Sequence, residues 1–215
     1  EESFTFDAQT GTVVRYKGMD PYVVVPETIE GVRVREIGDG AFRSNIYVYR
    51  VDLPDGVERI GESAFEQMNC LSSIYLPDTV KIIDNRAFYG IFQGSHFHWP
   101  AQLEIIGENA FYNTYITDPV VMPASLRSIG AEAFRNSFIS KVYLEGTIET
   151  IGDHAFEKSH LSYMQLNAYA FIPGISSTAF EGAASFQDLD LPWDTTQEVQ
   201  YAFRDLLSEQ APSCY

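Results

Sequence analysis

The sequence predicts an α/β fold: a right-handed solenoid with one parallel sheet and short turns, or single 3₁₀ or helical turns, on its convex side. Ala-Phe recurs seven times at spacings of 22 to 24 residues, and an Ile stands five positions before each of these phenylalanines. Because one short repeat cannot bury its own apolar face, self-similarity at this period indicates units that stack on one another. The right-handed sense follows from the strong preference of parallel strand crossovers for that hand.

The unit 71–88 shows how each repeat is expected to fold. Ile74 and Leu76 are separated by one residue, which is the pattern of a strand with one buried face. Pro77 ends this strand, because proline has no N–H to donate to a neighbouring strand. Ile83 marks a second apolar stretch, and the Ala-Phe that follows it predicts a turn. The equivalent positions of the other units predict two core ladders, one of strand residues (Val25, Leu53, Leu76, Trp99, Met122, Leu144, Leu166 and Leu191) and one of phenylalanines (Phe42, Phe65, Phe88, Phe111, Phe134, Phe156 and Phe180).

A glycine follows the isoleucine in five of the seven units, whereas Asp84 and Ser176 stand there in the other two. The backbone is expected to bend at this position. Gly adopts a positive φ at the lowest cost, and Asp does so more readily than most residues, so the pattern allows a positive φ here. The glycines concerned are Gly38, Gly61, Gly107, Gly130 and Gly152.

The two ends depart from the repeat and divide the chain into three parts. Residues 1–22 predict an N-terminal hairpin cap, and residues 23–192 hold about seven solenoid units. Residues 193–215 predict a C-terminal helical cap and tail, because residues 195–198 fit a capping box and apolar residues follow at helical spacing. Such a helix would also suit a partner or a membrane surface, but its acidic flanks favour capping. Caps are expected because an open solenoid end exposes core and unpaired strand edges.

The composition argues against several classes of partner. With 14 basic and 30 acidic residues, the net charge is −16 at pH 7, so phosphate backbones and anionic lipid would be repelled. We therefore expect no nucleic acid partner. Since no run of about 18 apolar residues occurs, we also expect no membrane insertion. Cys70 and Cys214 are the only cysteines, too few for a disulfide framework or a four-cysteine zinc site.

The repeat resembles the BspA-type leucine-rich repeats of bacterial and some protist surface proteins. Residues 53–65 follow the family pattern Leu-Pro-x-x-Val-x-x-Ile-Gly-x-x-Ala-Phe closely, and the resemblance covers about residues 4–192. It implies an extracellular or cell-surface protein, and some members of the family are adhesins for host matrix proteins or other microbes. It brings no catalytic motif. Glu145 and Asn167 depart from the family, because they stand where the pattern has a proline.

In such a solenoid, alternate strand residues point outward from one face. On this concave face we expect a binding site made by Tyr75, His96, His98, Tyr143 and Tyr163, since exposed aromatic side chains are typical of interface hot spots. The competing interpretation is that tyrosine is simply a good strand former. Eight strands about 4.8 Å apart would make a face about 35 Å long, which suits a protein or a glycan. The outward columns are Val24, Asp52, Tyr75, His98, Val121, Tyr143, Gln165 and Asp190, and Tyr22, Arg50, Ser73, His96, Pro119, Lys141, Tyr163 and Asp188.

The sequence offers little support for chemistry. His96 and His98 could share a metal ion, but the flanking outward positions supply no carboxylate. Asp188 and Asp190 form a carboxylate pair that could be a weak calcium locus, although solvated charges at an edge are the simpler interpretation. None of the familiar hydrolase, metalloprotease or nucleotide-binding motifs occurs. We therefore expect no enzyme, no cofactor and no metal site.

These patterns together favour a non-catalytic recognition or adhesion module, secreted or at the cell surface. We expect it to be a monomer that binds an extracellular protein or glycan on its concave face. One alternative is a structural spacer within a larger surface protein, and a more remote one is a hydrolase. A recognition face should carry a contiguous exposed aromatic patch, whereas a spacer should show a similar polar mixture on both faces.

Overall fold

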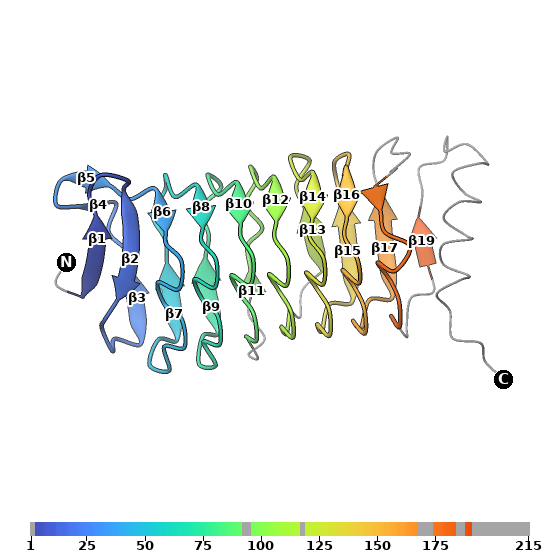
Figure 1. The fold of residues 1–215 in the computed structure, drawn as a ribbon, viewed down its shortest axis with the longest axis horizontal. Coiled ribbons are helices and arrows are strands. Elements are labelled where there is room, and N and C mark those ends of the chain that lie inside the picture. Colours follow the sequence, from blue (N-terminus) through green and yellow to red (C-terminus); the bar gives the residue numbers. More distant parts are fainter. Residues whose placement is uncertain (1–2, 92–95, 117–118, 167–173, 184–187, 191–215) are drawn as a thin grey trace.

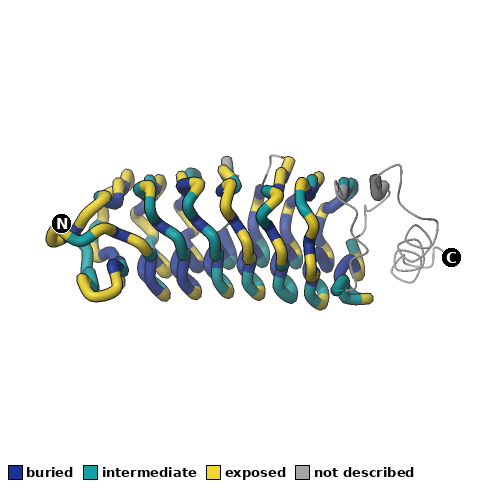
Figure 2. Tube along the Cα trace, turned by 90° about the horizontal axis from the view of Figure 1, so that it is seen from above, coloured by how far each residue is buried: buried dark blue, intermediate teal, exposed yellow. Residues whose placement is uncertain are grey.

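The structure, a computed structural model, describes residues 3–91, 96–116, 119–166, 174–183 and 188–190. It is a long stack of coils, one for each repeat, with the N-terminus at one end (Figure 1). The stack is nearly straight in both views, so the face predicted to be concave is close to flat along its length (Figures 1 and 2).

The strands predicted around the leucine ladder are present and pair in parallel. They form two four-stranded sheets, with the order β11-β9-β7-β3 in one and β13-β15-β17-β19 in the other. The bounds are β3 Tyr22–Val24, β7 Arg50–Asp52, β9 Ser73–Tyr75, β11 His96–Phe97, β13 Val120–Met122, β15 Lys141–Leu144, β17 Tyr163–Leu166 and β19 Asp188–Asp190. We call their outward surface the strand face. In the described part of the chain no pairing joins β11 to β13, so the ladder is interrupted there, at the unit whose sequence departs most from the repeat.

The prediction of a single parallel sheet is wrong, because the isoleucine stretches form a sheet of their own. Nine strands pair in the order β1-β2-β6-β8-β10-β12-β14-β16-β18, and we call this the isoleucine sheet. Its bounds are β1 Phe4–Asp7, β2 Thr12–Tyr16, β6 Glu36–Ile37, β8 Arg59–Ile60, β10 Ile82–Ile83, β12 Ile105–Ile106, β14 Ser128–Ile129, β16 Thr150–Ile151 and β18 Gly174–Ile175. The nearly constant period places the Ile of each coil beside the Ile of the coil before it. The residue that follows an Ile can therefore donate its backbone N–H to the carbonyl of the Ile one coil earlier, as Gly107 does to Ile83 at 2.8 Å.

The N-terminal segment folds as the antiparallel hairpin β1–β2, and β2 also pairs in parallel with β6. A second small antiparallel pair, β4 (Thr28–Ile29) with β5 (Val32–Arg33), follows it. The helix predicted within residues 193–215 lies outside the described residues.

The Ala-Phe segments are turns, and the described residues contain no helical or 3₁₀ turn. These turns are also joined from coil to coil by backbone hydrogen bonds. The Phe88 N–H donates to the Ala110 carbonyl at 2.8 Å, and the Phe111 N–H donates to the Ala133 carbonyl at 2.8 Å. Neighbouring coils are thus joined along the isoleucine sheet, along their turns and, except between β11 and β13, along the strand face.

The predicted phenylalanine ladder forms the centre of the core. Adjacent rings from Phe42 to Phe180 stack with centroids 5.1 to 5.4 Å apart. Tyr16 of the hairpin extends this spine, since its ring stacks on Phe42 at 5.2 Å. Buried residues recur in every coil (Figure 2). The predicted strand ladder is buried from Val25 to Leu144 apart from a partly buried Trp99, and the side chains of Leu166 and Leu191 lie outside the description.

The glycines after the isoleucines have a different cause from the one expected. None of them has a positive φ, which instead occurs two residues later, for example at Ser63 and Asn109 with φ of 55°. Close packing of the coils explains the glycines. A Cβ at Gly107 would lie 2.5 Å from the backbone nitrogen of Asn85, and one at Gly130 would lie 2.6 Å from that of Glu108. Any side chain there would push two coils apart.

Candidate binding face

The strand face contains the outward columns that the sequence predicts. Tyr22, Arg50, Ser73 and His96 are partners in register across the first sheet. Val121, Tyr143, Gln165 and Asp190 are partners across the second. Strand alternation places the residues between them, such as Val51 and Val142, in the core with no exposed surface.

Tyr75 and His98 form one pair on this face. The Tyr75 side chain is 47% exposed, and its ring stacks on the His98 imidazole at a centroid distance of 6.0 Å. Nε2 of His98 lies 3.0 Å from Oδ1 of Asp78, which also accepts the N–H of Ala101 at 3.0 Å. The hydrogen bond from His98, followed by that from Ala101, holds the pKa of Asp78 below its ordinary value. The carboxylate thereby fixes the orientation of the imidazole beside the tyrosine ring.

Tyr143 and Tyr163 form a second pair, with ring centroids 5.6 Å apart. They project from β15 and β17 and are half-buried. The two pairs therefore stand on different sheets, and Val121, which is 43% exposed, lies on the coil between them. His96 occupies its predicted place opposite Ser73, and its side chain lies outside the description.

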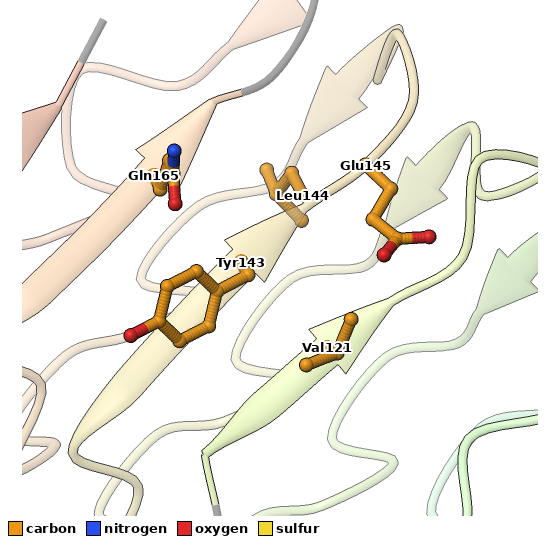
Figure 3. Close-up of a pocket in the computed structure, with 5 residues that line it drawn as sticks. All are labelled: Val121, Tyr143, Leu144, Glu145 and Gln165. Atoms are coloured by element: carbon orange, nitrogen blue, oxygen red, sulfur yellow. The ribbon is translucent and has the colours of Figure 1, made fainter.

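A shallow hollow of about 250 Å³ opens on the strand face beside the second pair. Val121, Tyr143, Leu144, Glu145 and Gln165 line it. Figure 3 shows the Tyr143 ring between the strands of Val121 and Gln165, with the carboxylate of Glu145 directed toward the strand of Val121. Tyr143 lies on β15, whereas Glu145 is the first residue after that strand ends at Leu144, and both side chains line the hollow. The hollow thus combines an aromatic wall, an aliphatic contact and two polar side chains.

The sequence interpretation missed a group of exposed aromatic residues in the segments that enter the strands. Near the N-terminus, Tyr47 and Tyr49 are about half exposed, and Tyr49 packs edge-on against Tyr22 at 6.3 Å. Further along, Phe138 is 47% exposed, and its ring packs tilted against Tyr115 at 4.9 Å and stacks on His160 at 4.1 Å. The last three residues each stand four positions after the Phe of the repeat. This shared position in the repeat could have predicted, from the sequence alone, that the three rings lie side by side.

Other kinds of site find no support in the described part of the chain. No group of three or more His, Cys, Asp or Glu side chains there is arranged to hold a metal ion. A search of the same residues finds no helix with the length and apolar character needed to cross a membrane.

Comparison with known protein families identifies the repeat. Residues 35–162 and 127–210 match the BspA type leucine rich repeat region, in six copies. The chain belongs to the BspA-type leucine-rich repeat family. This membership explains the solenoid, and it leaves the ligand of the strand face open. Among curated proteins, none matches the chain significantly.

Three solved structures share the fold. The leucine rich repeat protein TpLRR of T. pallidum is 23% identical, with a TM-score of 0.57 over 95% of this chain and 94% of its own. A leucine rich cell surface protein of Faecalibacterium prausnitzii A2-165 is 21% identical, with a TM-score of 0.66 over 89% of this chain and 53% of its own. The pneumococcal vaccine antigen PcpA is 16% identical, with a TM-score of 0.58 over 98% of this chain and 44% of its own. The chain thus spans about half of the latter two.

Proposed function

We propose that this BspA-type protein is a non-catalytic recognition module, exposed at a bacterial cell surface or secreted, which binds an extracellular protein or glycan through its strand face. Membership of the family supports a binding role. The fold it shares with a cell surface protein and a vaccine antigen is consistent with an extracellular location.

The observation that carries this proposal is the uneven distribution of exposed apolar side chains. Among the described residues, the large hydrophobic residues that are exposed are Val14, Met19, Tyr22, Val24, Ile46, Tyr47, Tyr49, Tyr75, Ile105, Tyr115, Val121 and Phe138. All except Val14, Met19 and Ile105 lie on the strand face or in the segments that enter its strands. Exposed side chains gathered on one side of a molecule mark an interaction surface, whereas scattered ones do not.

The same distribution argues against a spacer. The outward positions of the isoleucine sheet carry Glu36, Arg59, Ser128 and Thr150 together with Ile82 and Ile105. A spacer would present this kind of mixture on both sides. The hydrolase alternative would need a nucleophile beside a base. In the described residues the His98 ring contacts Asp78 and Tyr75, neither of which is a serine, threonine or cysteine nucleophile.

The experiment is an array of extracellular proteins and glycans probed with this chain, followed by variants against any partner it captures. The variant with Tyr75, His98, Tyr143 and Tyr163 changed to alanine should fold, as judged by circular dichroism, and bind at least about 30-fold more weakly, since a true anchor contributes about 2 kcal/mol or more. A control variant with Ile105→Ser, Ser128→Ala and Thr150→Ala on the isoleucine sheet should bind like the parent. If the quadruple variant binds the partner as tightly as the control variant does, the strand face is rejected as the binding surface.

A further inference from the structure

We infer that the hollow beside Tyr143 binds the guanidinium group of an arginine side chain supplied by a partner protein. This inference rests on the proposed function and narrows it, because it selects a protein ligand over a glycan and names the group recognised. Its evidence comes from the size of the hollow, its chemistry, its place in the repeat and the charge of the chain.

The size of the hollow fits one side chain. Pockets that enclose drug-sized ligands measure about 300–1,000 Å³, whereas this hollow has a volume of about 250 Å³ and is open to solvent. It accommodates the end of one long side chain while the rest of the partner lies across the neighbouring strands. A partner lying there would also contact Val121, which is exposed at the rim.

The chemistry of the hollow selects a planar cation. The lining combines the Tyr143 ring, the carboxylate of Glu145 just past the end of β15, and the amide of Gln165 on the neighbouring strand. Arginine can stack on an aromatic ring while its N–H groups reach a carboxylate in bidentate fashion. The protein already uses this stacking elsewhere, since the Arg86 guanidinium carbon lies 4.1 Å from the centroid of the Tyr89 ring.

Glu145 is where the repeat changes to make this site. The equivalent positions of the four preceding coils hold Pro54, Pro77, Pro100 and Pro123, and Glu145 is the first departure from proline. Neither the Glu145 carboxylate nor the Gln165 amide makes a hydrogen bond or ion pair with another described residue. Both groups are therefore available to a ligand. An exposed carboxylate in place of a proline contributes nothing evident to the solenoid itself.

The net charge of the chain also favours a basic partner. Acidic residues outnumber basic ones by 30 to 14, so the long-range field attracts cationic segments and repels anionic ones. Lys141 is the basic residue on the same strand as Tyr143, and it lies in the other outward column, opposite Tyr163. The hollow itself has no basic side chain in its lining.

The test uses small probes on the isotope-labelled chain, observed by NMR. N-acetyl-arginine amide should cause saturable shifts in the backbone amide signals of Val121, Tyr143 and Gln165. N-acetyl-citrulline amide, which has the same shape without the charge, should cause none. N-acetyl-lysine amide should bind more weakly than the arginine probe, because its ammonium group lacks the planar fork. Added salt should weaken arginine binding, since both partners are charged.

Variants then assign the groups. Tyr143→Leu should weaken arginine binding about two- to fivefold, the range of an exposed cation–π contact, and Glu145→Gln should weaken it about fivefold or more. Glu149→Gln, an exposed carboxylate paired with Arg127 away from the hollow, is the matched control and should leave binding unchanged. Thermal melts of all three variants check that each one folds.

The outcomes separate this inference from the proposed function. If arginine and citrulline probes cause equal shifts, or neither causes shifts at tens of millimolar, the arginine site is rejected, while the strand face still stands or falls by its captured partner. If lysine binds as well as arginine, the planar stacking on Tyr143 is rejected. Shifts that persist in both Tyr143→Leu and Glu145→Gln would place the cation elsewhere and overturn the assignment.

Discussion

The isoleucine sheet and the strand face are built from the same coils, yet they differ in regularity. The isoleucine sheet runs without interruption through nine strands, and each of its repeat strands has two residues. The strand face is split into two sheets, and its strands vary from two to four residues. Ile recurs at the inward position of every repeat of the first, whereas the outward positions of both sides change from coil to coil.

This difference indicates a division of labour within one repeat. Positions that must touch both neighbouring coils are restricted by packing, so the same residue types recur in them. Outward strand positions contact solvent, so they tolerate aromatic, charged and small residues alike. Variation on a regular scaffold is how repeat proteins place a binding surface. The following predictions test whether the two sides can be separated experimentally, from the largest expected effect to the smallest.

Truncation of the spine should have the largest effect. Phe111 stacks between Phe88 and Phe134 at 5.2 Å on each side, so Phe111→Ala should lower the free energy of unfolding by about 3–5 kcal/mol. Phe180→Ala, near the C-terminal end, should unfold less of the chain. Urea denaturation followed by circular dichroism measures both. Equal loss of cooperativity in the two variants would contradict a stack held together by nearest-neighbour contacts.

Adding a methyl group between coils should have the next largest effect. Gly130→Ala places a Cβ about 2.6 Å from backbone atoms of the preceding coil, and the resulting strain should cost about 1–3 kcal/mol. Glu108→Ala, an exposed change in a neighbouring turn, is the control and should stay within about 0.5 kcal/mol of the parent. If Gly130→Ala is also neutral, the coils are less closely packed than the structure indicates.

The contribution of Glu66, in one of the turns, to the free energy of unfolding should depend on pH. Its carboxylate is buried, which by itself would raise its pKa, but hydrogen bonds from Arg86 and Ser63 and the charges of Arg86 and Arg43 outweigh burial and lower the pKa. Because the folded pKa is depressed, its stabilisation is present above the unfolded value of about 4.3 and is lost as pH falls through the folded pKa.

Glu66→Gln should therefore lower the free energy of unfolding by about 1.5 kcal/mol at pH 7. The gap between parent and variant should persist at pH 5 and shrink at pH 3, which urea melts at the three pH values can measure. A gap that is independent of pH would show that the carboxylate charge is not what stabilises this turn.

Changes on the strand face should have the smallest effect on stability. Tyr75→Ser removes a ring that is half exposed and should change the free energy of unfolding by no more than about 0.5 kcal/mol, while weakening any partner bound on that part of the face. A loss comparable to that of Phe111→Ala would make Tyr75 part of the scaffold. The supposed division between the two sides would then fail.

Much of the fold could be predicted from the sequence, and the errors have physical causes. The parallel strands, the outward columns and the phenylalanine spine follow from apolar spacing. The isoleucine sheet was missed because a strand of two residues shows no alternation. The inter-unit glycines were given the wrong cause, because a close approach between coils cannot be distinguished from a positive φ in one dimension. Trp99 stands in the leucine column and yet is only partly buried, since its coil is where the strand ladder is interrupted.

The stacking of the coils and the composition of the core follow from the repeat pattern alone, because a nearly constant period places like residues level with one another in every coil. Which outward side chains meet depends instead on the folded geometry. The stacking of Tyr75 on His98, the hydrogen bond of that His98 to Asp78, and the hollow that Tyr143 forms with Val121 and Gln165 depend on distances across neighbouring coils. Those distances vary with strand length and with local interruptions, which the repeat pattern does not specify.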